Sequence, residues 1–317
     1  MIEYRNIKKS YGDKPIIQDV SFTVEKGEFV VIIGPSGCGK TTTVKMLNRL
    51  IDASEGEIFI NGVSTKDMDL IKLRTSIGYV IQQIGLFPNM TVEENISVVP
   101  RIMKWDKEKT LNRVKELLNM VNMPYNEYAK KYPRQLSGGQ QQRIGVLRAL
   151  AVNPPIIIMD EPFGALDPIT REILQSEVKK IQKELNITVL FITHDMHEAM
   201  KMADRILFMD HGKILQDAPP KEMLLHPANQ EISKFITLQE VSVKGSQMTA
   251  EDLMEPLSEQ PRETDDLLVV GAKEKISEIG SRYDLSSTNR LYVKNEEGMI
   301  VGVITVESVI RLLMKQV

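Results

Sequence analysis

A glycine-rich segment near the start of the chain has the residue types and the spacing that bind phosphate groups. Residues 34–41 read GPSGCGKT and match the pattern G-x-x-x-x-G-K-[ST]. Glycines let backbone N–H groups converge on phosphate oxygens, and a helix that begins here adds positive potential. Lys40 supplies a full positive charge, and the Thr41 hydroxyl is suited to bind Mg²⁺. The nucleotide-binding candidates of this segment are Gly34, Pro35, Ser36, Gly37, Cys38, Gly39, Lys40, Thr41 and Thr42.

Two acidic residues follow a run of apolar residues later in the chain. Ile156–Met159 is apolar throughout and leads directly into Asp160 and Glu161. Carboxylates at the end of a buried strand can reach a metal ion at the carboxyl edge of a parallel sheet. We expect Asp160 to hold Mg²⁺ through water, and Glu161 to orient and polarise an attacking water molecule. Together with the phosphate-binding segment, these residues predict a site that hydrolyses a nucleotide.

A second glycine-rich segment determines the class of enzyme. Residues 136–140 read LSGGQ and resemble the signature motif of the ABC ATPase family. Physically, the segment is another glycine-rich helix N-terminus, with Ser137 as the N-cap, and therefore a second phosphate site. The resemblance implies a head-to-tail homodimer that encloses two ATP molecules. In it, each phosphate-binding segment faces four residues of the other chain, namely Ser137, Gly138, Gly139 and Gln140.

Four further residues stand where this family has functional side chains. Tyr11 occupies the position of an aromatic residue that stacks on adenine. Gln82 matches a glutamine that contacts Mg²⁺ and the attacking water, although Gln83 beside it leaves a one-residue alternative open. Asp167 lies in a loop that, by the resemblance, communicates across the dimer. His194 follows an apolar strand, where the family has a histidine that contacts the γ-phosphate.

Strands and helices alternate in the order that brings these residues together. The apolar run Phe29–Ile33 predicts a strand buried on both faces, as in parallel sheets, followed by a helix over Thr41–Leu50. Further strands are expected at Pro155–Met159 and Val189–Thr193, with a helix between them from about Thr170 to Leu185. The predicted fold is therefore α/β, with a P-loop (RecA-like) ABC ATPase core.

Two additions to this core are expected. Short β-like runs, such as Glu57–Ile60, occur in residues 1–33 and 51–83, where the resemblance implies an antiparallel β subdomain. From Thr91 to Tyr128 charged residues alternate with Leu, Val and Met in a helical pattern, which predicts a helical insertion at about residues 90–150.

The character of the chain changes after about Gln239. Residues 240–247 are polar and predict a linker between an ABC ATPase domain at residues 1–239 and a small α+β module at residues 248–317. The segments Thr249–Met254 and Gly302–Ile310 resemble the first and last parts of a CBS domain. Such domains usually occur as tandem pairs that bind adenine nucleotides, and this chain has room for one. Single modules that pair across the homodimer, and a module that only packs, remain alternative interpretations.

The bulk properties agree with a protein that works beside a membrane without crossing it. Apolar residues make up 42% and charged residues 26%, which are ordinary values for a soluble protein. The net charge of −3 argues against a general nucleic-acid binder. The single cysteine, Cys38, excludes an intrachain disulfide and fits a reducing cytosol. There is no signal-peptide pattern, and no apolar run approaches the ~20 residues that span a bilayer.

The stretch Ile77–Pro88 resembles the ATPase subunits of bacterial importers for glycine betaine, carnitine and choline. That resemblance implies an ATP- and Mg²⁺-dependent subunit at the cytoplasmic face of the membrane, with an integral-membrane permease and an extracytoplasmic solute-binding protein as partners. The alternatives are the same role for another small amine or amino-acid-like solute, and a nucleotide-sensing regulator without a transport function. DNA-maintenance ATPases need a long coiled-coil insertion and translation-type members need two ATPase units, so both are excluded.

Overall fold

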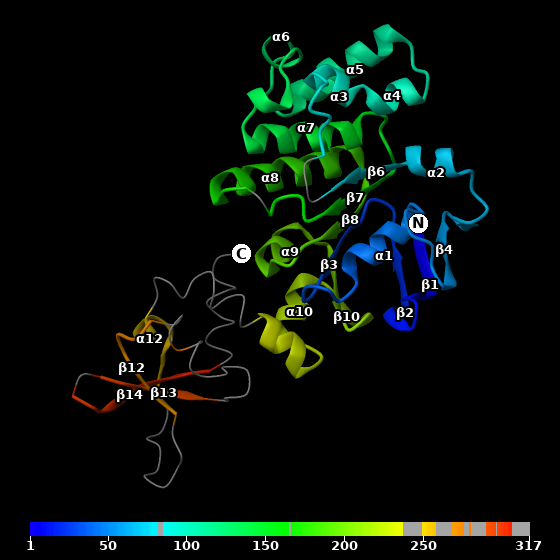
Figure 1. Ribbon diagram of the computed structural model, residues 1–317. Helices are drawn as coiled ribbons and strands as arrows, with labels where there is room; N and C mark the ends of the chain where they lie inside the picture. Colours follow the sequence, from blue (N-terminus) through cyan, green and yellow to red (C-terminus); the bar gives the residue numbers. More distant parts are fainter. Residues whose placement is uncertain are drawn as a thin grey trace. The chain divides into compact units, whose positions relative to one another are not determined.

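The computed structural model describes residues 1–81, 85–164, 166–236, 249–257, 268–275, 279, 290–295 and 297–305 (Figure 1). The chain divides into two compact units. The first comprises Met1–His194 and Glu198–Asp217, and the second comprises Asp195–His197 and Ala218–Val317. The predicted boundary after residue 239 and the predicted linker at residues 240–247 lie outside the described residues.

A sheet of ten described strands forms the frame of the first unit, in the order β5-β4-β1-β2-β10-β9-β3-β8-β7-β6. The last five strands of this order pair in parallel. Their bounds are β9 Arg205–Asp210, β3 Phe29–Ile33, β8 Thr188–Ile192, β7 Ile156–Asp160 and β6 Ile77–Val80. β3, β7 and β8 are buried along their whole length, because branched and aromatic side chains cover both faces. The carboxyl ends of all five strands therefore meet at one edge of the sheet.

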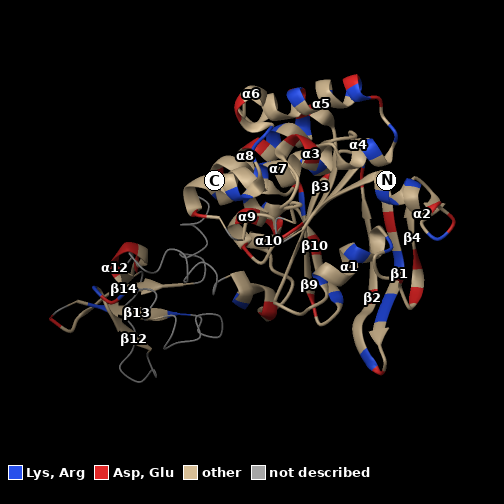
Figure 2. Ribbon diagram, turned by 45° about the horizontal axis from the view of Figure 1, so that its top comes forward, with Lys and Arg blue, Asp and Glu red and all other residues tan. Residues whose placement is uncertain are grey.

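The other half of the sheet is mainly antiparallel. β1 pairs with β2 and with β4, and β4 pairs with β5, whereas β10 joins β2 in parallel. The bounds are β1 Ile2–Tyr11, β2 Lys14–Val24, β4 Glu55–Ile60, β5 Val63–Ser64 and β10 Lys213–Ala218. Charged residues occur along β1, β2 and β4 (Figure 2), whereas buried residues of β1 such as Ile2 and Tyr4 belong to the core. The predicted antiparallel subdomain is confirmed.

Each of the next four helices directly follows or precedes a strand of the parallel half. Their bounds are α1 Lys40–Leu47, α2 Leu70–Thr75, α8 Pro168–Leu185 and α9 Met196–Met202. α1 ends earlier than predicted, because Arg49 has a φ of 51° and takes the chain out of the helix. α8 begins earlier than predicted, because the Asp167 side chain accepts a hydrogen bond from the Thr170 N–H and proline fits the first helical turn. No described helix has the length and the apolar character to cross a membrane.

The predicted helical insertion is also confirmed. It contains α3 Val92–Ile96, α4 Val98–Ile102, α5 Lys107–Met120 and α6 Tyr125–Tyr128, and it leads through a 3₁₀ turn at Pro133–Gln135 into α7 Gly138–Leu150. The insertion contacts α7 through α3 and through the buried Arg113 of α5.

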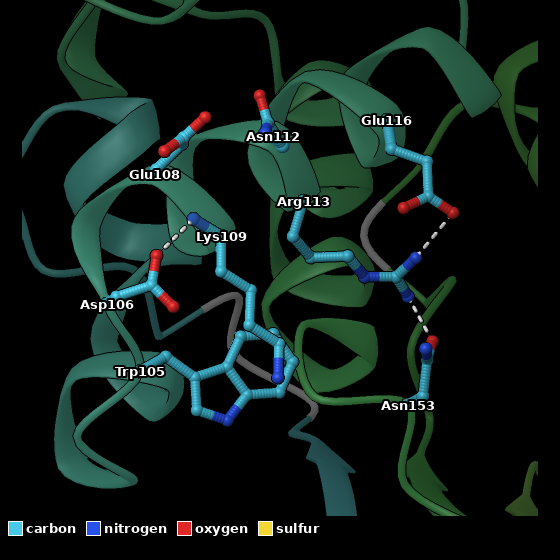
Figure 3. Close-up of a pocket in the computed structure, with 8 residues that line it drawn as sticks. All are labelled: Trp105, Asp106, Glu108, Lys109, Asn112, Arg113, Glu116 and Asn153. Atoms are coloured by element: carbon cyan, nitrogen blue, oxygen red, sulfur yellow. Dashed lines mark hydrogen bonds and ion pairs between the residues drawn. The ribbon is translucent and has the colours of Figure 1, made fainter.

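Arg113 fastens α5 to the end of α7. Its guanidinium donates hydrogen bonds to the carbonyls of Leu150 and Ala151, at 3.1 and 3.2 Å, and to the Asn153 side chain. Figure 3 shows the guanidinium between Asn153 and Glu116, whose carboxylate lies 2.7 Å away. Because a helix leaves its last carbonyls without partners, this side chain stabilises the C-terminus of α7 and joins it to the insertion.

The second unit contains a small sheet with its own core. Its described elements are α10 Pro220–Leu225, a further helical stretch at residues 230–236, α12 Ala250–Leu253, β11 Glu255–Pro256, β12 Val269–Gly271, β13 Leu291–Lys294 and β14 Ile300–Ile304. The strands lie in the order β11-β14-β13-β12. Buried apolar residues of α12 and of three strands form the core, among them Leu253, Val270, Val293 and Ile304. These elements match the predicted α+β composition, whereas the predicted closing helix lies outside the described residues.

Candidate active site

The phosphate-binding segment is a tight loop between β3 and α1, at the carboxyl edge of the sheet. Gly34 and Gly37 have φ angles of 151° and 80°, which side chains disfavour. A Cβ on Gly34 would lie 1.9 Å from the backbone oxygen of Met209, so two backbones approach too closely there for any side chain. A Cβ on Gly37 would meet none of the described atoms within 4 Å, so only the backbone conformation restricts that position.

The Lys40 side chain lies inside this loop. It is 6% exposed, and its Nζ donates hydrogen bonds to the carbonyl oxygens of Gly34 and Pro35 at 2.7 and 2.8 Å. Buried charge is costly unless polar groups surround it, and the two carbonyls meet that need. The ammonium is therefore held in place among the backbone groups that the motif assigns to phosphate binding.

The only cysteine of the sequence, Cys38, is part of the same loop. Its Sγ is 3.9 Å from Lys40 Nζ, and the residue is 6% exposed. Burial raises the pKa of the thiol, although the neighbouring ammonium works against this. The reactive thiolate is therefore scarce at neutral pH.

Thr41 and Asp160 meet where α1 begins and β7 ends. The Thr41 hydroxyl donates a hydrogen bond of 2.9 Å to Oδ1 of Asp160, and the Tyr79 hydroxyl lies 3.4 Å from Oδ2. Burial raises the pKa of Asp160, and burial together with the nearby carboxylate raises the pKa of Tyr79. A hydroxyl and a carboxylate are hard oxygen ligands of the kind that Mg²⁺ prefers, so the donor set fits this ion.

Glu161 and His194 follow neighbouring parallel strands, β7 and β8. His194 Nδ1 lies 3.3 Å from Glu161 Oε2, with side-chain exposures of 56% and 21%. Glu161 has a φ of 46°, and its N–H donates a hydrogen bond of 3.0 Å to the Ile192 carbonyl. A positive φ is costly for a glutamate, and residues held in such conformations cluster at functional sites. The backbone thus directs this carboxylate to the edge of the sheet where Lys40 and Asp160 also lie.

The second glycine-rich segment begins α7, as predicted. The Ser137 hydroxyl accepts a hydrogen bond from the Gln140 N–H at 3.2 Å, and the Gln140 side chain accepts one from the Ser137 N–H at 3.0 Å. This reciprocal arrangement is a capping box. Gly138 has no described atom within 4 Å of an added Cβ, whereas a Cβ on Gly139 would lie 2.4 Å from Thr170 of α8.

The remaining predicted residues lie around these two loops or outside the described part of the chain. Tyr11 ends β1 and is 53% exposed, with Lys9 Nζ 5.0 Å from its ring centroid. Asp167 is the N-cap of α8, and its hydrogen bonds to Thr170 lower the pKa of the carboxyl group. Gln82 and Gln83 lie outside the described residues, so their alternative assignments both stay predictions.

Tyr79 is a member of the site that the sequence did not reveal. It lies on β6, which pairs with β7 so that Tyr79 is opposite Ile158, two residues before Asp160. Its position three residues before Gln82 was the only hint in the sequence that it lies near the site. Its contact with Asp160 depends on the pairing of β6 with β7, and no sequence motif predicts that strand order.

Three comparisons with known proteins agree with this geometry. Residues 17–164 match the family described as ABC transporter. The choline transport ATP-binding protein OpuBA of Bacillus subtilis (strain 168) is 47% identical over 308 residues, which is 97% of this chain and 79% of OpuBA. The glycine betaine/carnitine/choline transport ATP-binding protein OpuCA of the same organism is 56% identical over 237 residues, or 74% of this chain and 62% of OpuCA. The chain thus spans less than two thirds of OpuCA.

A solved structure supports the fold of the ATPase core. The ATP-binding cassette MJ0796, in a dimeric post-hydrolysis state bound to ADP and Pi, superposes with a TM-score of 0.62 at 36% identity, covering 69% of this chain and 99% of that one. Sequence motifs, site geometry and relatives thus converge, and the chain belongs to the ABC transporter family, as one of its ATP-binding ATPase subunits.

Proposed function

We propose that this protein hydrolyses ATP to energise the import of a quaternary amine, namely glycine betaine, carnitine or choline, through a separate permease. The observation that carries this proposal is the 47% identity to a choline transport ATP-binding protein over 97% of the chain. That match includes the C-terminal part, which the phosphate chemistry does not need. An importer of this kind places the subunit at the cytoplasmic face of the membrane, with an extracytoplasmic solute-binding protein on the other side.

The proposed chemistry assigns one task to each group of the site. Lys40 and the loop N–H groups bind the β- and γ-phosphates, because they combine fixed dipoles with a full charge. Glu161 accepts a hydrogen bond from the attacking water and orients it towards the γ-phosphate. His194, 3.3 Å from Glu161, lies close enough to contact the same phosphate. Thr41 and Asp160 would hold Mg²⁺, which neutralises phosphate charge when bound. Gln82 is proposed to contact the same ion and the same water.

A complete site is proposed to need two chains. Ser137, Gly138, Gly139 and Gln140 offer a helix N-terminus to phosphate, yet they lie on α7 rather than in the Lys40 loop. In the proposed homodimer each ATP lies between Lys40 of one chain and Ser137 of the other, with Tyr11 against adenine and Asp167 near the dimer axis. The dimeric state of the MJ0796 cassette supports this arrangement.

The proposed contact with the permease is a groove of about 310 Å³. Its lining comes from the end of α2, from β6, from α4 and from α7, and includes Tyr79, Phe87 and Arg148. Phe87 is 43% exposed, and the Arg148 guanidinium donates a hydrogen bond of 2.7 Å to the Gly85 carbonyl. The groove therefore connects the segment after Gln82 with the helix that begins at the signature motif. Closure of the dimer would move both together and transmit force to a permease segment bound there.

The domain organisation is part of the proposal. The ATPase domain is assigned to residues 1–239, the linker to residues 240–247, and a CBS-like module to residues 248–317. The module is proposed to pair with its copy in the homodimer. Its separate four-stranded sheet and core support an independent folding unit.

Solute uptake tests the proposal. Cells under high salt are assayed for uptake of labelled glycine betaine, carnitine and choline, with wild type compared with Lys40→Ala at the native locus. Lys26→Ala is the matched control, because Lys26 is exposed at the opposite edge of the sheet, before β3. If uptake of one solute is lost in Lys40→Ala but not in Lys26→Ala, the result supports the proposal and identifies the cargo. Unchanged uptake of all three, from a strain without a second uptake system, contradicts the assignment to quaternary amines and leaves the ATPase assignment intact.

A further inference from the structure

A buried carboxyl group contacts the residue before His194 and has no part in the chemistry described so far. Glu198 is on α9 and is 5% exposed. Ionised carboxylates are rarely buried to this extent without several partners, because desolvation costs several kcal/mol. Its partners therefore indicate which parts of the protein this carboxyl group connects.

The first partner belongs to the loop that carries His194. The Thr193 hydroxyl donates a hydrogen bond of 2.6 Å to Oε2 of Glu198, and Thr193 is itself 1% exposed. Thr193 immediately precedes His194 and follows the last residue of β8. The carboxylate thus restrains the backbone from which His194 projects.

Two further partners belong to α8, which begins at the loop that carries Asp167. Gln175 donates a hydrogen bond of 3.2 Å to Oε1 of Glu198, and Arg171 Nε lies 3.9 Å from the same oxygen. The Arg171 guanidinium also donates from Nη2 to the Leu166 carbonyl, 3.3 Å away. Leu166 directly precedes Asp167, so Arg171 joins the Glu198 carboxylate to the loop that carries Asp167.

We propose that Glu198 is a positioning residue that couples the His194 loop to the Asp167 loop through Thr193 on one side and Arg171 on the other. This inference rests on the proposed function, because it takes the roles of His194 and Asp167 from it. The coupling means that a shift of His194 on loss of the γ-phosphate is passed to the residues that face the other chain. A carboxylate suits this task because its two oxygens accept hydrogen bonds from a hydroxyl and an amide, while its charge attracts the guanidinium 3.9 Å away.

The test compares two substitutions of the same chemistry in the full-length protein. Glu198→Gln keeps the shape of the side chain but leaves one oxygen acceptor and no charge for Arg171. Glu28→Gln is the control: Glu28 pairs with Arg205 at 2.6 Å, is partly buried, and precedes β3 at the opposite edge of the sheet. We expect kcat for ATP to fall about 10-fold or more in Glu198→Gln with little change in KM, because small misplacements of reacting groups lower rates strongly. Glu28→Gln should keep the wild-type kcat.

A double-mutant cycle tests whether Arg171 is the connection. Arg171→Met should lower kcat as Glu198→Gln does, and the double variant should be no slower than either single variant, since the effects of one connected pair do not add. Additive losses would overturn the coupling through Arg171. A kcat in Glu198→Gln equal to that of Glu28→Gln would overturn the proposal as a whole.

A second pair of variants covers the case in which Glu198→Gln does not fold. Thr193→Val removes the hydroxyl at nearly constant shape, whereas Thr193→Ser keeps it. We expect kcat to fall in Thr193→Val and to be largely retained in Thr193→Ser; equal kcat values in the two would overturn the role of this hydrogen bond. Lys40→Ala is assayed in parallel. Full activity in Lys40→Ala would contradict the proposed function itself. Loss of activity in Lys40→Ala supports the proposed function, and the Glu198 and Thr193 variants then test the coupling separately.

Discussion

Oε2 of Glu161 lies 3.3 Å from Nδ1 of His194, and the two residues follow neighbouring parallel strands. The contact joins the residue proposed to orient water to the residue proposed to contact the γ-phosphate. Both side chains depend on the register of β7 with β8, in which Asp160 pairs with Ile192. The relationship leads directly to the first prediction.

Glu161→Gln should trap the ATP-bound dimer. The amide retains the shape of the carboxylate but cannot accept a proton or polarise water as strongly, so turnover should fall by about 100-fold or more while closure survives. Size-exclusion chromatography with and without ATP measures the dimer, and phosphate release measures turnover. The double variant Lys40→Ala/Glu161→Gln should stay monomeric with ATP. Hydrolysis at the wild-type rate in Glu161→Gln would show that another residue activates the water.

Asp160→Asn should stabilise the nucleotide-free protein while abolishing hydrolysis. Burial raises the pKa of Asp160 above its ordinary value of 3.8, so the folded state binds this proton more tightly than the unfolded state does. The free energy of unfolding therefore increases as the pH falls through the raised pKa towards the ordinary value, and at neutral pH the charged carboxylate is destabilising. Asparagine removes that cost and keeps an oxygen acceptor for Thr41.

The expected gain for Asp160→Asn is about 1 kcal/mol, in the range seen when strained or charged active-site residues are neutralised. Thermal unfolding from pH 4 to pH 8 measures it, with the wild-type curve approaching the variant's curve as the pH falls. A variant that unfolds at a lower temperature than wild type at neutral pH would contradict this account of Asp160.

Complete alkylation of Cys38 should block ATP binding. The thiol is buried in the phosphate-binding loop, 3.9 Å from Lys40 Nζ, so a bulky adduct would displace the loop and its lysine. Because burial raises the pKa of this thiol, modification should be slow at pH 7 and faster at pH 9. Mass spectrometry follows the modification, and binding of a fluorescent ATP analogue follows the loss. Cys38→Ser should bind ATP and resist the reagent; ATPase activity unaffected by full alkylation would refute the prediction.

A chain that ends at Gln239 should form a less stable or unregulated dimer but should retain the ATP-binding site. All described residues that surround Lys40 and Asp160 precede this position, so ATP binding should persist. If the C-terminal modules pair, the ATP concentration needed for half-maximal dimer formation should increase. Analytical ultracentrifugation of the truncated and full-length proteins measures this concentration. Identical values, together with normal regulation, would leave the module without a role in pairing.

The sequence predicted those features that depend on short stretches of chain. Ser137 caps a helix because a serine followed by glycines and Gln140 can form a capping box locally. Phe29–Ile33 is a buried strand, and its uninterrupted apolar run is the pattern of strands that are covered on both faces. The capping box is fixed by residues a few positions apart, and the apolar run is continuous in the chain, so the linear pattern contains both signals.

The features that the sequence did not predict depend on how distant elements pack. Tyr79 reaches Asp160 only because β6 lies beside β7. Glu198 meets Arg171 only because α9 packs against α8, and each of these residues alone looks like an ordinary surface charge in the sequence. The end of α1 was placed too late, because nothing in the helical pattern indicates the positive φ of Arg49.

Gly34 and Gly37, two of the three glycines of the phosphate-binding loop, also differ in which substitutions each position could accept. At Gly37 the space beside the backbone is open, so asparagine, which tolerates a left-handed conformation, could replace glycine. At Gly34 a side chain would clash with the backbone oxygen of Met209. Every residue type at position 209 has this oxygen, so a substitution there cannot remove the clash. In a randomised library of this loop, position 37 would therefore return a small set of residues, and position 34 would return glycine whatever its neighbours had become.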